Sequence, residues 1–274
     1  MHLDAHQHFW KYTEVEYDWI DDSMRDLRRD FLPPDLAPLL KANGFDACVA
    51  IQARQSDEET HWLLDLAEQS EIVAGVVGWI NLCSPELAAR LDAYRKSPKL
   101  KGFRHVLQGE PDAFMLQPEF VAGITMLAEH DFCYDILVFE RQLESVRTLV
   151  SELPEMRLVI DHIAKPDIVN ASFDDWARHM AVIAGAGHVY CKVSGMVTEA
   201  DWGNWTTATF ERYLAQVFES FGEDRVMFGS DWPVCTVAAN YAKVVEIVRS
   251  FVGRKCPDAE DNIFGGTASR FYGI

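Results

Sequence analysis

The sequence lacks the features that mark secreted, membrane-spanning and disulfide-bonded proteins. Its six cysteines are scattered, none of them in a C-x-x-C pair, and most lie within apolar runs, where a free thiol behaves as a small hydrophobe. No basic segment followed by an apolar one opens the chain, so we expect no signal peptide. No apolar run reaches the roughly 18 residues of a membrane-spanning helix. These absences predict a reduced, cytoplasmic protein.

Positive charge is also scarce. The chain has 25 Lys and Arg against 43 Asp and Glu, which gives a formal net charge of −18. Phosphate backbones and anionic lipid would repel such a chain, so we expect neither nucleic acid nor membrane surfaces as general partners. The excess charge serves solubility and still permits a local basic pocket for an anionic product. The sequence does not indicate an oligomeric state.

No linker, low-complexity tract or short repeat divides the chain, which predicts one domain over residues 1–274. Eight short apolar runs recur along it, and several are continuous rather than alternating. Continuous runs are typical of strands buried on both faces of a parallel sheet. The runs cover residues 3–9, 47–53, 72–80, 100–107, 132–139, 157–163, 189–194 and 226–230.

Segments with helical periodicity lie between these runs. Residues 58–69, for example, place Trp62 and Leu66 on one stripe, and Ser84 is a candidate N-cap for a helix over 85–94. Eight strands alternating with helices predict an α/β fold, a single (β/α)8 TIM-type barrel. A doubly wound open sheet is the alternative, although no G-x-G-x-x-G follows the first strand. The remaining helices are expected at 119–129, 141–153, 173–184, 207–221 and 241–251.

The longest insertion candidate, residues 11–38, follows the first predicted strand and contains Trp19. In a barrel it would lie over the C-terminal face, where active sites form and long loops act as lids. A surface loop without function is the alternative interpretation.

A barrel brings the C-terminal ends of its strands to one face, so polar residues at those ends should converge on one site. Every predicted strand supplies at least one such residue, and this convergence predicts an enzyme. In strand order the residues are His6 and His8; Gln52 and Arg54; Trp79 and Asn81; Arg104 and His105; Asp135; Asp161 and His162, with Lys165 beyond; Lys192 and Ser194; and Ser230, Asp231 and Trp232.

The first of these pairs carries the sharpest signal. His6 and His8 are two residues apart in a predicted strand, where side chains alternate, so both should point the same way. Two adjacent imidazoles can chelate a metal or polarise a carbonyl group. Two surface histidines spaced by chance are the alternative, because H-x-H is a short motif.

An ordered set of motifs along nearly the whole chain resembles the amidohydrolase superfamily, in its branch of sugar-lactone hydrolases. The greatest similarity is to L-fuconolactonases and L-rhamnonolactonases. The family pattern D-H-x-G-K-P has alanine in place of glycine here, at Ala164, which adds a methyl group near the site. The matching stretches are HQHFW at 6–10, WIDDSM at 19–24, RRDFLP at 28–33, QARQ at 52–55, GFRH at 102–105, QGEP at 108–111, YD at 134–135, DHIAKP at 161–166, CKVSG at 191–195, FGSDWP at 228–233 and NIFGGT at 262–267.

The resemblance implies a (β/α)8 barrel and one or two divalent metals. A lysine or glutamate on strand four marks the two-metal members, and this strand ends in Arg104 and His105 instead, which argues against two metals. One metal, such as zinc, held by His6, His8 and Asp231, with His162 as a further candidate ligand, is one expectation. Catalysis without a metal is the other.

Hydrolysis of a lactone needs a polarised carbonyl group, a deprotonated water and a proton for the leaving alkoxide. Asp231 is the candidate general base, with a helix N-cap as its alternative role. Arg104, His162, His6 and His8 are the candidates that polarise the carbonyl group, with or without a metal. A hydrogen-bonded core histidine is the alternative for His162.

Sugar hydroxyls need polar partners, and the ring needs a flat apolar surface. Structural ion pairs and core aromatic packing are the alternatives for these side chains. The arginines are also candidates for the carboxylate of the acid product. The polar candidates are Gln52, Arg54, Arg104, Asp135 and Lys192, and the flat surfaces are Trp19, Trp79 and Trp232.

Together these expectations predict that the protein hydrolyses a sugar lactone, L-fuconolactone or a close relative, to the open-chain acid. The alternatives are a metal-dependent decarboxylase or another hydrolase of the same superfamily acting on a different small acid, and a barrel that binds a sugar acid without converting it. Gas release from an aromatic acid, or ligand binding without turnover, would favour the decarboxylase or the binding protein, respectively.

Overall fold

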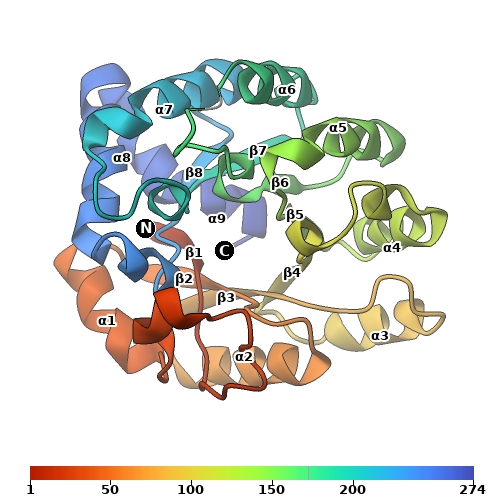
Figure 1. The fold of residues 1–274 in the computed structure, drawn as a ribbon. Coiled ribbons are helices and arrows are strands. Elements are labelled where there is room, and N and C mark those ends of the chain that lie inside the picture. The colour runs from red at the N-terminus through yellow and green to blue at the C-terminus, as the bar shows by residue number, and fades with distance from the viewer. Residues whose placement is uncertain (172) are drawn as a thin grey trace.

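Eight parallel strands and the helices between them form a barrel in the computed structural model, which describes residues 1–171 and 173–274 (Figure 1). Each strand pairs with the next, and the ring is closed where Gln7 pairs with Trp232 and His8 N–H donates to the Trp232 carbonyl at 2.7 Å. This closure confirms the predicted (β/α)8 barrel and excludes the open sheet. The strands are β1 (Leu3–Gln7), β2 (Ala47–Ile51), β3 (Val73–Gly78), β4 (Leu100–His105), β5 (Cys133–Ile136), β6 (Leu158–Ile160), β7 (Val189–Val193) and β8 (Val226–Phe228).

The helices surround the strands as an outer ring, as Figure 1 shows for α1 to α8. Polar side chains cap the starts of two of them. The Ser56 hydroxyl accepts from Glu59 N–H ahead of α2, and the Asn240 side chain accepts from Lys243 N–H ahead of α8. The helices are α1 (Pro33–Ala42), α2 (Asp57–Gln69), α3 (Leu87–Tyr94), α4 (Pro118–Glu129), α5 (Leu143–Glu152), α6 (Asp174–Ala184), α7 (Thr207–Phe221), α8 (Tyr241–Lys255) and α9 (Thr267–Tyr272).

Several predicted boundaries differ from the observed ones, and two of them have a clear local cause. Helix α3 begins at Leu87 rather than at residue 85, because the Ser84 hydroxyl accepts from Glu86 N–H and forms a turn before the helix. The insertion ends before residue 38, because α1 begins at Pro33, whose fixed φ suits the first position of a helix.

The strands are buried on both faces. In β2, Cys48 and Ala50 pack outward against the helices, whereas Val49 and Ile51 point into the barrel. This alternation follows the period of two of a strand, and apolar residues on both faces account for the continuous apolar runs in the sequence.

Helix α9 fills the N-terminal end of the barrel. Phe271 and Tyr272 pack with the inward side chains of the strands. Two basic residues at strand starts hold the helix in place: Arg157 donates to the Phe271 carbonyl at 2.8 Å and Lys101 to the Gly273 carbonyl at 2.9 Å. The barrel is therefore closed at this end, and its open face is the C-terminal one.

The segment between β1 and α1, residues 11–30, lies over that open face and is called the lid below. Its base is fixed by a bridge in which Trp10 and Phe31 exchange both backbone hydrogen bonds, at 3.0 and 2.9 Å. Within the lid, Arg28 donates to the Ile20 carbonyl and pairs with Asp22 at 2.8 Å. Of the described helices, none is both long and apolar enough to cross a membrane.

Candidate active site

A cavity of about 420 Å³ opens at the C-terminal face of the barrel. Its walls come from the lid and from the loops that follow β1, β2, β4, β5, β6 and β8. Seven of the residues predicted from strand ends and from the insertion are part of this lining: His8, Trp19, Arg54, Arg104, His162, Lys165 and Asp231. The full lining is His8, Glu16, Asp18, Trp19, Ala53, Arg54, Gln55, Arg104, Val106, Gln108, Leu137, His162, Lys165, Asp231 and Val234.

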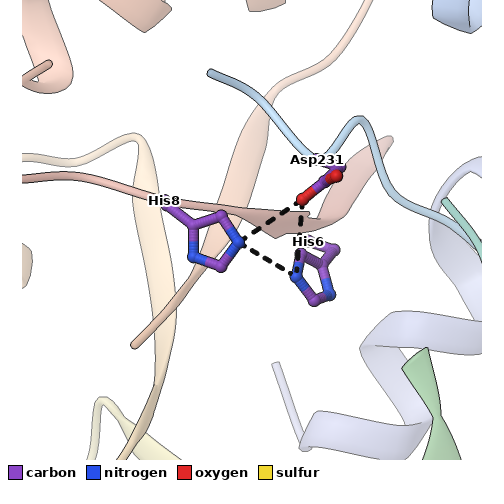
Figure 2. A group of neighbouring side chains, drawn as sticks. All are labelled: His6, His8 and Asp231. Carbon is purple, nitrogen blue, oxygen red and sulfur yellow. Dashed lines mark hydrogen bonds and ion pairs between the residues drawn. The ribbon is translucent and has the colours of Figure 1, made fainter. Parts of the chain in front are cut away.

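His6 in β1 and His8 just after it point the same way, as their spacing predicts (Figure 2). Their Nε2 atoms lie 3.2 Å apart. His8 Nδ1 lies 2.9 Å from the Ile51 carbonyl, which can only accept, so His8 carries its proton on Nδ1 and presents a lone pair at Nε2 when neutral. An irregular register between Asp4 and Gln7 gives β1 an extra residue opposite β2, as in a β-bulge.

Asp231 follows β8 and faces these imidazoles. Its Oδ1 lies 3.4 Å from His8 Nε2, 3.8 Å from His162 Nε2 and 4.0 Å from His6 Nε2. Its backbone has a φ of 57° and its N–H donates to the His6 carbonyl at 2.8 Å. Gly229 allows this approach, because a Cβ there would lie 2.5 Å from His6 Cβ. The helix-cap role does not fit an Asp231 carboxylate that faces three imidazole rings.

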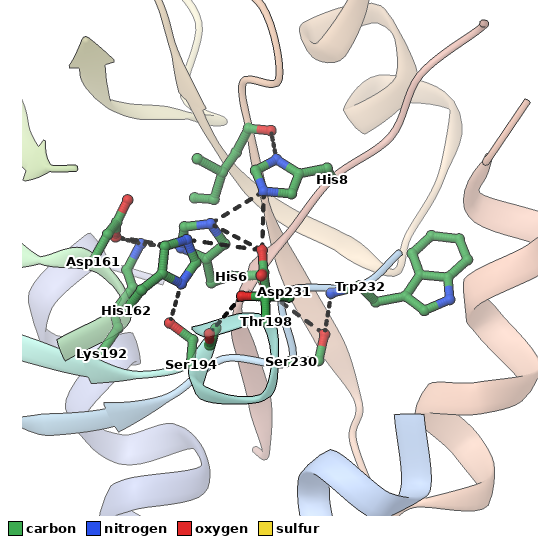
Figure 3. Close-up of polar contacts among 12 residues, drawn as sticks. His6, His8, Asp161, His162, Lys192, Ser194, Thr198, Ser230, Asp231 and Trp232 are labelled. Atoms are coloured by element: carbon green, nitrogen blue, oxygen red, sulfur yellow. Dashed lines mark hydrogen bonds and ion pairs between the residues drawn. The ribbon is translucent and has the colours of Figure 1, made fainter. Parts of the chain in front are cut away.

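His162 comes from a left-handed stretch after β6. Residues 162–165 have φ values of 53°, 48°, 60° and 45°, and Ala164 is the third of them. The His162 ring lies 4.3 Å from the His6 ring, and its Nδ1 lies 2.9 Å from Ser194 Oγ (Figure 3). Gly195 makes room for this ring, because a Cβ there would lie 2.5 Å from Nδ1. Burial, reinforced by His6, lowers the pKa of His162 well below its usual range, so the ring is neutral.

A buried ion-pair cluster supports the histidines from below. Lys192 Nζ lies 2.5 Å from Asp135 Oδ2, 3.0 Å from Asp161 Oδ1 and 3.2 Å from His6 Nδ1. The Tyr272 hydroxyl of α9 donates to Asp135 at 3.0 Å. These side chains have no solvent exposure apart from 1% at Tyr272, so each charge depends on its partners.

Arg104 joins this cluster to the cavity. Its Nη1 lies 3.0 Å from Asp161 Oδ2 and 3.3 Å from His6 Nε2, and its Nη2 donates to Gln52 Oε1 at 3.0 Å. Burial favours the neutral acid at Asp161, but Lys192, His6 and Arg104 together hold the Asp161 pKa well below its usual range. Burial raises the Asp135 pKa to about 6, although Lys192 opposes the shift.

Five predicted substrate contacts are absent from the cavity lining given by the described residues. Gln52, Asp135 and Lys192 lie in the cluster below the cavity, which favours a positioning role. The Trp232 ring packs against Phe31 with centroids 5.3 Å apart, away from the cavity. The fifth is Trp79, whose indole N–H donates to His105 Nδ1 at 3.3 Å. Trp19, 37% exposed, is therefore the tryptophan that borders the cavity.

Sequence reasoning missed several residues that form or hold the site. Glu16, Asp18, Gln55 and Gln108 line the cavity but follow no strand-end rule, and Lys165 was noted without a role. Glu59 is the least expected, since it is a carboxylate only 1% exposed.

Glu59 accepts from Ala53 N–H at 3.1 Å and from Arg54 N–H at 2.9 Å, and so fixes the loop that carries Arg54. The sequence feature that could have identified Glu59 is the S-x-x-E pattern from Ser56 to Glu59, which is typical of the start of a helix. Asp4 was also missed. It accepts from Ser230 N–H at 2.9 Å and from the Tyr241 hydroxyl at 2.9 Å, which fixes the loop before Asp231.

The imidazoles and Asp231 match the donor set of a metal site. A tetrahedral zinc ion with bonds of about 2.0–2.2 Å separates its ligand atoms by roughly 3.3–3.5 Å. Two of the three separations among His6, His8 and Asp231, 3.2 and 3.4 Å, are close to this spacing, and the third, His6 to Asp231, is longer at 4.0 Å, so one ion would draw these two groups slightly together. His6 Nδ1 lies 3.3 Å from Asp161, in the place of the carboxylate that commonly orients a metal-binding histidine.

Comparison with known proteins finds close relatives over the full length. A family model described as amidohydrolase matches residues 3–274. An L-fucono-1,5-lactonase from Burkholderia multivorans (strain ATCC 17616 / 249) is 41% identical, and the match covers 100% of this chain and 96% of that protein. A second L-fucono-1,5-lactonase, from Burkholderia ambifaria, is 35% identical over 99% of this chain and 95% of its own length.

A solved structure has the same fold throughout. The crystal structure of an amidohydrolase from Burkholderia multivorans with bound zinc superposes with a TM-score of 0.96 at 40% sequence identity. The superposition covers 100% of this chain and 99% of the other.

Proposed function

Because the chain belongs to the amidohydrolase family, we propose that it hydrolyses the ring ester of a sugar lactone to the open-chain acid. The substrate we propose is L-fucono-1,5-lactone or a close relative, on the strength of the two Burkholderia lactonases that match over their full length. The observation that carries the proposal is the convergence of Asp231 with three imidazoles at the edge of one polar cavity.

Asp231 is the general base of the proposed reaction. It takes a proton from a water molecule, whose oxygen attacks the lactone carbonyl carbon and forms a new C–O bond. The bond from that carbon to the ring oxygen then breaks, and the ring oxygen leaves as a hydroxyl group after taking the proton that Asp231 had accepted. A carboxylate placed for such a transfer contributes about 10²- to 10⁴-fold to the rate.

Arg104 and His162 stabilise the oxyanion that forms on the carbonyl oxygen. Neutral His162 can accept at Nδ1 from the Ser194 hydroxyl, and this tautomer places a proton on Nε2. We assign that Nε2–H and the Arg104 guanidinium to the developing negative charge, for which fixed donors are effective. Asp161 and Gln52 hold Arg104 in position.

One divalent ion fits the ligand set of His6, His8 and Asp231. When bound, such an ion supplies positive charge that polarises the carbonyl group and acidifies water. A solved relative has bound zinc, which supports zinc as the ion to test. Arg104 and His162 provide the donors for the alternative, in which catalysis needs no metal.

The cavity suits one sugar ring. Its volume of about 420 Å³ lies at the lower end of the range for small-molecule sites. Trp19 provides a flat apolar face, and the side chains of Arg54, Gln55 and Gln108 provide polar partners for ring hydroxyls.

The decarboxylase alternative is less well supported. Its substrate carries a carboxylate, which an unpaired lysine or arginine in the site would favour. The lysine and arginines of the described lining, Arg54, Arg104 and Lys165, each already form an ion pair with a protein carboxylate. A neutral ester makes no such demand.

A pH-indicator assay with a panel of 1,4- and 1,5-aldonolactones tests the proposal, because hydrolysis releases one proton per lactone at neutral pH. We expect the highest kcat/KM for L-fucono-1,5-lactone or a neighbouring deoxy or pentono lactone. Asp231→Asn, which keeps the shape but not the base, should lose most of this activity. A rate at background level for every lactone would refute the function.

A further inference from the structure

Three cationic side chains line the cavity, and all three are neutralised by the protein itself. Arg54 Nη1 lies 2.6 Å from Glu16 Oε1 of the lid. Lys165 Nζ lies 3.1 Å from Glu199 Oε1, which follows β7. Arg104 is paired with the buried Asp161. A ligand carboxylate would therefore have to compete with a protein carboxylate for the charge of each of them.

The remaining charges of the site are negative. Asp18 and Asp231 line the cavity without a paired lysine or arginine among the described residues. Among the lysine, arginine and carboxylate side chains of this set, three cations stand against five carboxylates, namely Glu16, Asp18, Asp161, Glu199 and Asp231. The formal charge is three minus five, or −2, and a divalent ion on His6, His8 and Asp231 would bring it to zero. In neither state does the set offer net positive charge to an anion, and the chain as a whole carries a net charge of −18.

We propose that Glu16 and Glu199 act as internal carboxylates that occupy Arg54 and Lys165, so that the site accepts an uncharged ester and rejects its own anionic product. The inference rests on the proposed function and deepens it. The substrate class becomes lactones without a carboxylate, and the acid is released because the cations that would hold it are occupied. This role differs from the pairing of the arginines with product that the sequence suggested.

The chemistry of the reaction gives this arrangement its effect. A lactone is neutral, and hydrolysis converts its carbonyl carbon into a carboxylate at neutral pH. Lactone and acid share nearly all their hydroxyl groups, so contacts to hydroxyls bind the two about equally. Charge and the change from ring to open chain are the differences that a binding site can use to discriminate between them, and charge is the one to which Arg54 and Lys165 respond.

The test measures binding of an anion against a neutral ligand of the same carbon chain. L-fuconate and the uncharged alditol L-fucitol are titrated calorimetrically into wild-type protein and into Glu16→Gln and Glu199→Gln. Each substitution leaves one cation without its carboxylate. We expect the ratio of fuconate to fucitol affinity to rise roughly two- to fivefold in each variant, because the partly exposed cation becomes available to the ligand. The gain should shrink at high salt.

Glu14→Gln is the matched control. It removes the same charge from the same lid, at an exposed position, and leaves Glu16 with Arg54. It should leave the ratio at the wild-type value. Unchanged ratios in both variants would overturn the inference, and so would wild-type protein that binds fuconate more tightly than fucitol.

The binding ratios test the charge inference, and the lactonase assay tests the proposed function, so either can be refuted without the other. Lactone hydrolysis with unchanged ratios would keep the proposed function and remove the charge inference. Raised ratios without hydrolysis of any lactone would keep the charge inference and remove the proposed function. Circular dichroism checks that each variant retains the fold. If Glu16→Gln is unstable, Glu199→Gln still tests the inference.

Discussion

Glu59 makes the stability of this protein depend on pH in a way that one substitution should remove. Its carboxylate is almost fully buried, and burial raises its pKa from an ordinary 4.5 to about 7, although hydrogen bonds from Arg54 and Ala53 oppose the shift. A carboxyl group whose pKa is higher in the folded state contributes its full stability below the unfolded pKa. That stability is lost as the pH rises through the folded pKa, here between about 4.5 and 7.

The size of the effect follows from the shift. A change of about 2.5 pKa units corresponds to about 3 kcal/mol, and some 2–3 kcal/mol of it should fall between pH 5 and pH 8. Glu59→Gln keeps the acceptor oxygen for both backbone N–H groups and cannot ionise. We expect the free energy of unfolding of this variant, relative to wild type, to rise by that amount between the two pH values.

Urea unfolding at pH 5 and pH 8 measures the difference. Glu58→Gln is the control, because Glu58 is the neighbouring carboxylate, is fully exposed and has a pKa lowered mainly by backbone hydrogen bonding. Its unfolding should follow wild type at both pH values. Parallel pH dependence in wild type and Glu59→Gln would show that the buried carboxylate is not protonated near neutrality, and the reasoning would be refuted.

Four further results are expected. Asp231→Asn should lower kcat for lactone hydrolysis by about 10²-fold or more, and a loss below tenfold in the pH-indicator assay would contradict its role as base. Metal-stripped protein should bind one zinc per chain by calorimetry, and His8→Ala should not; equal binding by both would exclude the proposed ligands. Ala164→Gly should raise the free energy of unfolding by about 0.5–1 kcal/mol, because alanine is strained at a φ of 60°. The control Ala177→Gly, within α6, should lower it by a similar amount. If both substitutions changed the free energy of unfolding in the same direction, the result would count against backbone strain. Lys192→Met should cost about 3–5 kcal/mol in urea unfolding, since two buried carboxylates lose their counter-ion, and a cost under 1 kcal/mol would mean that they bind protons instead.

The barrel could be predicted from the sequence because its signal is repeated eight times. Continuous apolar runs such as residues 47–53 gave the right element type even where β2 proved shorter, at Ala47–Ile51. Helix α9 could not be predicted in the same way. Six residues carry too little periodicity to indicate a helix, and nothing local shows that Phe271 and Tyr272 would enter the barrel.

The candidate site was predictable in outline but not in depth. A position at a strand end predicts that a side chain lies near the C-terminal face of the barrel, but it does not predict whether that side chain reaches the cavity. Arg104 lines the cavity, whereas Lys192, also near a strand end, lies beneath it because Asp135 and Asp161 hold its ammonium group. Trp232 illustrates the other limit, since the left-handed turn at Asp231 precedes a ring that packs against Phe31 instead of facing the cavity.

The contact between β1 and β8 also means that the barrel cannot close until late in synthesis on the ribosome. Asp4 accepts from the Ser230 N–H across 226 positions of sequence. At about 5–20 residues per second, translation needs roughly 10–45 s to make that stretch. For that time β1 has one unpaired edge, and His6 and His8 lack the Asp231 carboxylate. A nascent chain of this protein should therefore need protection of its first strand until the eighth has left the exit tunnel.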